Sequence, residues 1–410
     1  MTEFYDALET RDQARRESDF FARLPGLLSH AKAHAPYWAR TLASIDPAAV
    51  TSRSGLAKLP VTRKSDLIDL QKAEPPFGGL LAAPLSALSR IFVSPGPIND
   101  PEGPEIDFWG SARGLFAAGF RKGDLVVNCL GHHLTPGGRI LESGLMTLGC
   151  PVIPGGVGNS EQQVLAIAAL KPVGYVGTPS FLRILLEKAA ELGVDISSIK
   201  RAWVSGEALP PSLRAEFDAR GISVLQGYAS ADLGLIAYET PAREGLVVNE
   251  TLLMEIVRPG TGDPVAEGEV GEVVVTNLCR VYPLIRFATG DLSALADGSS
   301  ACGRTNQRIK GWMGRADQTT KVKGMFVHPQ QVAEIAKRHP ELVRLRLVVA
   351  GEKGNDVMTL RAETVGGEKL ALSVRETMHA VLKLKGEVEF LPPGSLPNDG
   401  KVIEDVRKYD

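Results

Sequence analysis

A lysine near the end of the chain closes a turn-forming stretch, Leu396-Pro-Asn-Asp-Gly-Lys401. Proline fixes φ and glycine supplies unusual backbone angles, so the sequence predicts that Lys401 lies on a defined loop rather than on a frayed tail. A point charge on such a loop suits the neutralisation of a phosphate or carboxylate charge that develops during a reaction. Taken alone, this stretch is better explained by an ordinary solvated lysine, and only the rest of the chain favours the catalytic interpretation.

Four further parts of the chain combine strand-like runs with polar residues. They are Arg90–Asn99, Val204–Glu207 together with Gln226–Asp232, Tyr282–Asp291, and Gly314–Gly324. In open α/β sheets, ligands bind at the loops that leave the carboxyl ends of the strands. These parts of the chain are therefore candidates for ligand contacts.

The secondary structure that must position these candidate residues differs from one part of the chain to the next. Residues 10–75 are expected to be helices with polar faces. From about residue 85 to 240, strand-like runs alternate with helical segments, which predicts an α/β fold with a doubly wound, mostly parallel sheet. The strand-like runs are Leu125–Cys129, Pro151–Pro154, Gly174–Val176, Arg201–Val204 and Ser223–Gln226, and the helical segments include Pro179–Leu192 and Ser212–Arg220.

From about residue 245 to residue 410, the sequence follows two other patterns. Short strands with turns between about 245 and 300 predict a small antiparallel β subdomain. Beyond Asp317 we expect a small α+β module. Its predicted elements are strands Arg344–Val349, Val357–Ala362 and Glu387–Leu391 and helix Glu368–Leu384. A chain of 410 residues is too long to fold around one hydrophobic core. We therefore predict two domains, 1–315 and 316–410, joined by a hinge in the segment Gly311–Gly324.

Composition excludes several classes of function. A net charge of −2 argues against nucleic acid or an anionic membrane as the main partner. The four cysteines form no CxxC pair, the first residues contain no apolar signal region, and no apolar run reaches transmembrane length. These features predict a cytoplasmic protein.

The order and spacing of the polar segments resemble the adenylate-forming superfamily of acyl- and aryl-CoA ligases, and in particular its phenylacetate-CoA ligase branch. The resemblance spans nearly the whole chain. Its motifs are His34-Ala-Pro-Tyr-Trp38, Leu59-Pro-Val-Thr-Arg-Lys64, Arg121-Lys-Gly-Asp124, Leu148–Pro154, Thr178-Pro-Ser180, Tyr282–Asp291, Cys302-Gly-Arg-Thr305 and Gly314-Arg-Ala-Asp317.

This resemblance implies a role for individual residues. Lys401 would assist attack of a carboxylate on the α-phosphate of ATP, Asp291 would accept hydrogen bonds from the ribose hydroxyls, and Asp317 would be the hinge of a mobile C-terminal domain. Tyr228 would stack on adenine. The implied nucleotide-binding residues are Ser94, Gly96, Ser205, Gly206, Glu207, Tyr228, Ala229, Ser230, Asp291 and Arg315; the implied metal ligand is Asp232; the implied substrate-pocket residues are His132, His133 and Gly137. The ordinary alternatives are a strand-end aspartate, a surface arginine and a core tyrosine.

Two motifs depart from the family pattern. The phosphate loop, Ser94-Pro-Gly-Pro-Ile-Asn-Asp-Pro-Glu102, lacks the usual lysine, and its prolines remove N–H donors while Asp100 and Glu102 are expected to repel a polyphosphate. In Tyr228-Ala-Ser-Ala-Asp232 the expected phosphate-binding hydroxyl is replaced by Ala231, and the metal-binding carboxylate is one methylene shorter. Ser230 could supply a hydroxyl from the neighbouring position.

The adjacent histidines, His132 and His133, could line a polar acid pocket or bind a metal. Neighbouring side chains on a strand point to opposite faces, which favours one imidazole facing the pocket and one facing the surface. Cys302 alone makes no zinc site.

The sequence therefore predicts an acid–thiol ligase that uses ATP and Mg²⁺ to form an acyl-adenylate from a small acid, aromatic in the branch it resembles, and then transfers the acyl group to coenzyme A. The alternative is a nucleotide- or acyl-CoA-binding protein of the same fold with weak or absent adenylation. A homodimer is compatible with either prediction.

Overall fold

The computed structural model of the chain describes residues 3–316, 318, 320–322, 325–351 and 356–407. Its α-helices are α1 Gln13–His34, α2 Pro36–Thr41, α3 Arg53–Leu56, α4 Leu67–Ala73, α5 Ala112–Ala117, α6 Gly137–Thr147, α7 Ser160–Leu170, α8 Pro179–Leu192, α9 Pro211–Ala219, α10 Pro329–Arg338 and α11 Ala371–Leu382. Short 3₁₀ turns are η1 Ala7–Thr10, η2 Pro47–Ala49, η3 Lys64–Asp66, η4 Leu85–Ala87 and η5 Gly367–Leu370.

The strands are β1 Thr62–Arg63, β2 Arg90–Ser94, β3 Ile98–Glu102, β4 Val126–Asn128, β5 Val152–Pro154, β6 Gly174–Gly177, β7 Arg201–Val204, β8 Ser223–Ser230, β9 Gly234–Glu239, β10 Leu246–Val248, β11 Leu252–Val257, β12 Gly271–Asn277, β13 Phe287–Ser293, β14 Leu295–Ala296, β15 Arg308–Ile309, β16 Thr320–Val322, β17 Met325–Val327, β18 Arg344–Ala350, β19 Val357–Glu363, β20 Glu387–Leu391 and β21 Ile403–Asp405. The chain divides into two compact units. Unit 1 comprises residues 1–254, 275–287 and 296–312, and unit 2 comprises residues 255–274, 288–295 and 313–410.

A nine-stranded sheet with the order β14-β15-β10-β9-β8-β7-β6-β4-β5 organises unit 1. The five strands from β5 to β8 run parallel to their neighbours, whereas β8, β9, β10 and β15 pair antiparallel. The predicted α/β class with a doubly wound, mostly parallel sheet is confirmed.

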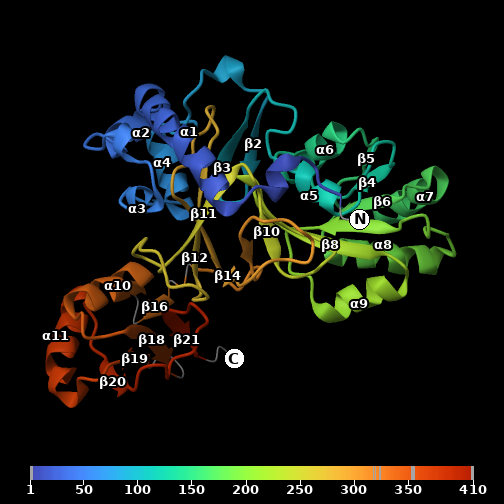
Figure 1. The fold of residues 1–410 in the computed structure, drawn as a ribbon. Helices are drawn as coiled ribbons and strands as arrows, with labels where there is room; N and C mark the ends of the chain where they lie inside the picture. Colours follow the sequence, from blue (N-terminus) through green and yellow to red (C-terminus); the bar gives the residue numbers. More distant parts are fainter. Residues whose placement is uncertain (1–2, 317, 319, 323–324, 352–355, 408–410) are drawn as a thin grey trace. The chain divides into compact units, whose positions relative to one another are not determined.

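Helices cover both faces of this sheet (Figure 1). Successive strand residues point to opposite faces, so Val127 of β4 packs with apolar residues of α7, α8 and α9, whereas the preceding Val126 packs with those of α5 and α6. The same alternation separates Tyr175 from Val176. The sheet is thus buried on both faces, which places polar residues at the strand ends.

Local signals set the ends of α8. The side chain of Thr178 accepts a hydrogen bond from the amide of Phe181 at 3.3 Å, Pro179 occupies the first turn, and Gly193 adopts φ +64° after the last turn. An N-cap, a proline and a C-terminal glycine in this order are strong boundary signals, and the predicted helix Pro179–Leu192 has the observed bounds.

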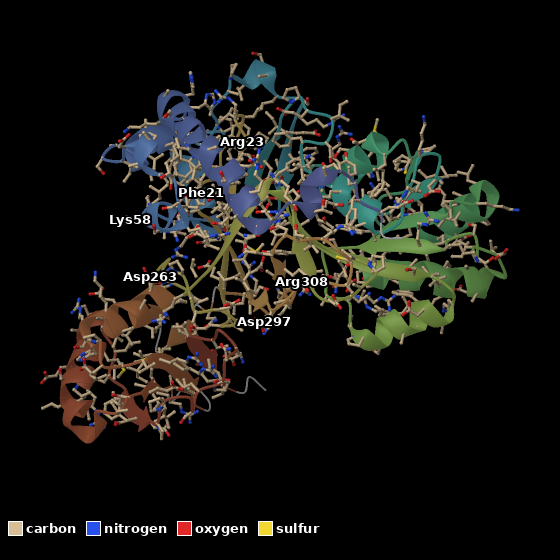
Figure 2. All side chains as sticks on the ribbon, viewed as in Figure 1. Phe21, Arg23, Lys58, Asp263, Asp297 and Arg308 are labelled. Carbon is tan, nitrogen blue, oxygen red and sulfur yellow. The ribbon has the colours of Figure 1, made fainter. Side chains whose placement is uncertain are left out.

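The region between residues 245 and 300 contributes to two sheets. Strands β11, β12 and β13 belong to a four-stranded sheet of order β1-β13-β12-β11, while β10 and β14 join the large sheet. At the β14–β15 end of the large sheet, the guanidinium of Arg308 in β15 donates a hydrogen bond to the carbonyl of Asp297 at 2.8 Å (Figure 2).

Unit 2 contains a sheet of order β20-β19-β18-β21, on which α10 and α11 pack. The predicted strands at Arg344, Val357 and Glu387 are present as β18, β19 and β20, and the predicted helix is divided into η5 and α11. Helix α10 and strand β21 were not predicted. Asp317 lies outside the described residues, and the predicted boundary between domains 1–315 and 316–410 stays a prediction.

Within the described ranges, none of the helices combines the length and the hydropathy of a membrane-spanning segment.

Candidate active site

Two predicted segments lie side by side at the carboxyl ends of β7 and β8. These strands are parallel neighbours, and Ser205, directly after β7, donates its hydroxyl hydrogen to the carbonyl of Gly227 at 2.9 Å. Gly227 tolerates no side chain, because a Cβ atom there would lie 1.8 Å from Cζ2 of Trp203. Tyr228 follows, half-buried, at a bulge between Tyr228 and Ala229.

The turn after Ser205 is open. Gly206 has φ +81°, a conformation that favours glycine, and the exposed Glu207 accepts a long hydrogen bond of 3.4 Å from the amide of Ser180. A flat ring could therefore approach the backbone of Gly206 without meeting a side chain of that residue.

Ser230 and Asp232 lie in the turn between β8 and β9. The Ser230 hydroxyl oxygen accepts a hydrogen bond from the amide of Leu233 at 3.2 Å, so it already supports the turn. Asp232 is buried, and its Oδ2 atom lies 2.6 Å from Nζ of Lys64. Its Oδ1 atom has no hydrogen-bond partner among the described residues.

The predicted phosphate loop is the turn of the β2–β3 hairpin. Ser94 pairs with Ile98 across the hairpin, and Pro95, Gly96 and Pro97 form its exposed tip. The Ser94 hydroxyl is buried and lies 3.5 Å from the carbonyl of Ile98, to which it donates.

The expectation that Glu102 repels a polyphosphate is wrong. Glu102 is buried and its carboxylate is paired with Arg90 at 3.2 Å and with Arg139 at 2.9 Å. Its charge is neutralised by one arginine of the hairpin and one of α6, and is not presented to the loop.

Asp100, in the same strand, has a different environment. It is 1% exposed, and neither carboxylate oxygen has a hydrogen-bond partner among the described residues. Burial, and after it the charge of Asp232, raises the pKa of Asp100 to about 7, whereas nearby Ser94 and Lys64 work against the rise.

The loop that carries the predicted substrate residues contacts this hairpin. The amide of Val93 in β2 donates to the carbonyl of Leu134 at 2.8 Å. His132 is half-buried and burial lowers its pKa, while His133 is exposed. The covered Nε2 atom of His132 has no hydrogen-bond partner among the described residues. Gly137 begins α6.

Unit 2 carries two predicted nucleotide contacts together. Asp291 and Arg315 form an isolated antiparallel bridge, and Nη1 of Arg315 lies 2.8 Å from Oδ1 of Asp291. Gly290 keeps this arrangement open, since a Cβ atom on it would lie 2.7 Å from Nη2 of Arg315. The carboxylate is mostly covered, and the guanidinium is half-exposed.

Lys401, also in unit 2, lies on a loop that other residues hold in shape. Gln318 donates to the carbonyl of Gly400 at 3.0 Å and accepts from the amide of Ile403 at 2.8 Å. Asn398 accepts from the amide of Val270 at 3.2 Å. The Lys401 side chain is 48% exposed and lies 3.5 Å from Glu404.

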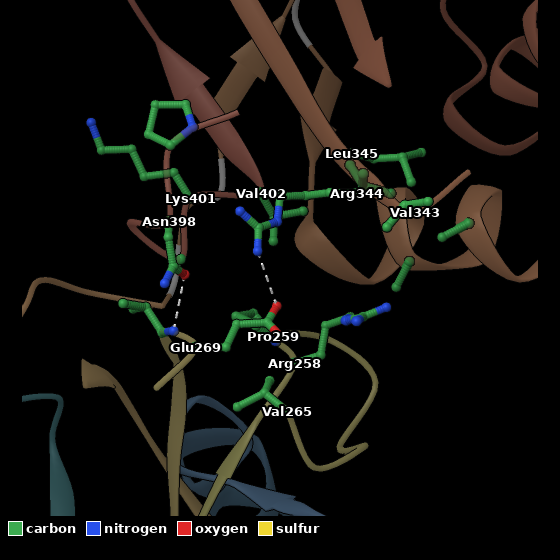
Figure 3. Close-up of a pocket in the computed structure, with 16 residues that line it drawn as sticks. Arg258, Pro259, Val265, Glu269, Val343, Arg344, Leu345, Asn398, Lys401 and Val402 are labelled. Atoms are coloured by element: carbon green, nitrogen blue, oxygen red, sulfur yellow. Dashed lines mark hydrogen bonds and ion pairs between the residues drawn. The ribbon is translucent and has the colours of Figure 1, made fainter. Parts of the chain in front are cut away.

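The same loop borders a cavity of about 80 Å³ within unit 2, which is also lined by Arg258, Glu269 and Arg344. Figure 3 shows Arg344 pointing toward Glu269, at 3.7 Å, and the Lys401 side chain extending away from that pair. The ammonium group of Lys401 therefore stays accessible.

Sequence reasoning missed the roles of Lys64 and Tyr282 beside Asp232. Both residues stand in stretches that carry the family resemblance, Leu59–Lys64 and Tyr282–Asp291, but their side-chain partners are set by tertiary contacts. Asp232 and Tyr282 both line a cavity of about 360 Å³ in unit 1. Buried carboxylate oxygens without donors suit a hard divalent cation, so the residues present fit Mg²⁺.

Comparisons with known proteins show which family the chain is similar to. A family model described as AMP-binding enzyme matches residues 112–279. A phenylacetate-coenzyme A ligase of Thermus thermophilus is 30% identical over 444 positions, covering 98% of this chain and 99% of that protein. Another, of Escherichia coli, is 29% identical and covers 97% of this chain and 95% of that protein.

Solved structures give the same result. An open conformation of 2-hydroxyisobutyryl-CoA ligase in complex with 2-HIB-AMP and CoA has a TM-score of 0.73 at 25% identity, covering 95% of this chain and 91% of that one. Similarity to a ligase over the full length of both chains, at the identity found for the Thermus protein, establishes the family. The chain belongs to the adenylate-forming acyl- and aryl-CoA ligases, in their phenylacetate-CoA ligase branch, and is an AMP-forming CoA ligase.

Proposed function

We propose that the chain activates a small aromatic carboxylic acid with Mg-ATP and transfers the acyl group to coenzyme A. The observation that carries the proposal is the Lys401 loop, which is hydrogen-bonded in a fixed shape while its ammonium group remains half-exposed. A protein that only binds nucleotides has no need of a positioned ammonium group. The aromatic class of the acid is supported by the phenylacetate-CoA ligase relatives.

In the first half-reaction, Asp291 accepts from the ribose hydroxyls and Ser205, Gly206 and Tyr228 form the adenine side. A carboxylate oxygen of the acid attacks the α-phosphorus, the bond from that phosphorus to the bridging oxygen breaks, and pyrophosphate leaves. The Lys401 ammonium stabilises the negative charge that grows on the α-phosphate oxygens. A magnesium ion held at Asp232 would shield the charges of the β- and γ-phosphates.

In the second half-reaction, the C-terminal domain moves and withdraws Lys401. The thiol sulfur of coenzyme A attacks the acyl carbon, the C–O bond to AMP breaks, and the thiol proton is released. Movement between the two steps is required because the group that assists adenylation occupies space that the thiol needs.

A pyrophosphate-release assay with Mg-ATP, coenzyme A and a panel of acids tests the proposal. The panel contains phenylacetate, benzoates, 2-hydroxyisobutyrate and straight-chain fatty acids, and each thioester is identified by mass spectrometry. We expect pyrophosphate and an aryl or arylacetyl thioester in equal amounts. Preference for 2-hydroxyisobutyrate would overturn the aromatic assignment, and AMP binding without pyrophosphate release from any acid would favour a binding protein.

A further inference from the structure

Two sets of contacts within unit 2 hold the loop that carries Lys401, residues 396–401. The first set comes from β18 and from Gln318. The buried Arg346 of β18 pairs with Asp399, and its guanidinium also donates to the carbonyl of Pro397 at 3.3 Å. Because this guanidinium is buried, the first set fixes the shape of the loop itself.

The second set joins the loop to the connection between β11 and β12, residues 258–270. The amide of Val270 donates to Oδ1 of Asn398 at 3.2 Å, and Nδ2 of Asn398 donates to the carbonyl of Gly268 at 3.4 Å. Gly400 packs against the same connection, since a Cβ atom on it would lie 2.7 Å from Cγ1 of Val270. The loop therefore fits this surface only without a side chain at position 400.

An ion pair adds to the second set. Nη2 of Arg344 lies 3.7 Å from Oε1 of Glu269, and Nη1 of Arg344 donates to the carbonyl of Leu396 at 3.3 Å (Figure 3). Arg344 thus connects the β11–β12 connection to the start of the loop. The side chains of Arg344 and Glu269 are 32% and 23% exposed, so salt screens their attraction.

The two sets differ in strength. The hydrogen bonds of Asn398, at 3.2 and 3.4 Å, lie at and beyond the upper end of the usual range, whereas Gln318 accepts from the amide of Ile403 at 2.8 Å. The proposed function requires Lys401 to withdraw between its two half-reactions. The second set is weak enough to break in that movement, while the first set keeps the loop in shape.

The second set also brings the loop onto the strand of the predicted ribose ligand. A Cβ atom on Gly400 would lie 3.2 Å from Cδ1 of Leu292, which directly follows Asp291 in β13. While these contacts are formed, the Lys401 loop packs on β13. This is the arrangement that adenylation needs, because Lys401 acts on a nucleotide whose ribose is bound at Asp291.

We propose that Asn398 and the Glu269–Arg344 ion pair form a latch that holds Lys401 in place for adenylation and releases it before thioester formation. The latch rests on the proposed function, because that function assigns Lys401 to the first half-reaction alone. Asn398 and Glu269 act through Lys401, so both are positioning residues. Changing them should alter one half-reaction and spare the other.

Asn398→Ala tests the latch by separating the half-reactions. Exchange of labelled pyrophosphate into ATP measures adenylation, and thioester formation from a supplied acyl-adenylate measures the second step. We expect kcat of pyrophosphate exchange to fall about tenfold at an unchanged KM for ATP, while thioester formation keeps its rate. Asn398→Asp keeps an oxygen that accepts from the amide of Val270 and should restore most of the activity.

The ion pair is tested through its dependence on salt. Glu269→Gln should slow pyrophosphate exchange about two- to fivefold at low ionic strength, and the difference from wild type should disappear at about 1 M NaCl. Glu267→Gln is the matched control, because Glu267 is an exposed carboxylate of the same connection. It should behave like wild type at both salt concentrations.

Amide hydrogen exchange gives a measurement that does not depend on activity. The amide of Val270 should exchange about tenfold faster in Asn398→Ala than in wild type or Glu267→Gln. Equal exchange rates at Val270, or an equal loss of both half-reactions, would overturn the latch. If wild type exchanges pyrophosphate and Asn398→Ala does so at the same rate, only the latch is overturned. If no acid supports pyrophosphate exchange in wild type, the proposed function is overturned, and with it the latch.

Discussion

At the scale of single residues, the backbone of the Lys401 loop is held by hydrogen bonds to the side chain of Gln318. Gly400, directly before Lys401, has φ +69° and packs so tightly that a Cβ atom would lie 2.7 Å from Val270. The loop is therefore set by backbone conformation and close packing. Its terminal charge remains available because the contact with Glu404 is long and partly exposed.

Lys401→Ala should abolish adenylation and spare thioesterification of a supplied acyl-adenylate, since the charge acts on the α-phosphate and not on the thiol. Pyrophosphate release and thioester formation are measured separately. Lys337→Ala, an exposed lysine in the last turn of α10, is the control and should keep both activities. Unchanged pyrophosphate release in Lys401→Ala would remove this residue from the mechanism.

Asp291→Ala should weaken AMP binding by about 2–4 kcal/mol, because hydrogen bonds from two ribose hydroxyls to a charged acceptor are lost. Calorimetry with AMP gives the affinity, and the change corresponds to roughly 30- to 1000-fold in Kd. The exposed Asp297, changed to alanine, is the control and should leave the affinity unaltered. Undiminished AMP affinity in Asp291→Ala would contradict the ribose assignment.

The difference between what the sequence predicted and what it missed is plain at this scale. Asp291 and Arg315 stand in two of the motifs that carry the family resemblance, and the structure joins them at 2.8 Å. Glu102 and Asp100 look alike in sequence, yet Glu102 is paired with two arginines and the carboxylate of Asp100 has no hydrogen-bond partner among the described residues. Arg90 faces Glu102 only once the hairpin has formed, and Arg139 is 37 residues away, so local spacing carried no signal for these partners.

At the scale of elements, the β2–β3 hairpin depends on α4. The buried side chain of Gln71 donates to the carbonyl of Asn99 at 2.9 Å and accepts from its amide at 2.8 Å. It serves as a substitute for a neighbouring strand. The contact holds in place the backbone of the residue next to Asp100.

Gln71→Ala should therefore lower the free energy of unfolding by about 1–3 kcal/mol, because the backbone groups of Asn99 lose their partners. Urea denaturation followed by circular dichroism measures it. Gln162→Ala, on an exposed face of α7, should change the free energy of unfolding little. A neutral Gln71→Ala would show that water replaces the side chain and that α4 does not position the hairpin.

Helix α8 was predictable from the signals at its ends, whereas α10 and β21 were missed. Helix α8 has a cap, a proline and a glycine, and its bounds agree with the prediction. Strand β21 has three residues and exists because it pairs in parallel with β18, while β10 joins the large sheet by pairing with β9. Such strands form because a partner strand lies beside them, and three residues of sequence do not specify that partner.

At the scale of the whole molecule, we expect the binding of ATP to depend on a divalent cation more than on the altered phosphate loop. Without a divalent cation, a non-hydrolysable ATP analogue should bind more weakly than AMP, because Pro95 and Pro97 offer no N–H donors and Asp100 lies near the turn. Added Mg²⁺ should recover much of the difference, leaving a high KM for ATP. Tight binding of the analogue in EDTA, well above the affinity for AMP, would show that the loop works despite its prolines.

The most direct test of the account is the exchange of labelled pyrophosphate into ATP. This exchange requires reversible formation of an acyl-adenylate, so it isolates the first half-reaction and needs no coenzyme A. We predict exchange that depends on an aromatic acid and on Mg²⁺ and that disappears in Lys401→Ala. If no acid supports exchange while AMP still binds, the chain does not form an acyl-adenylate and the account is wrong.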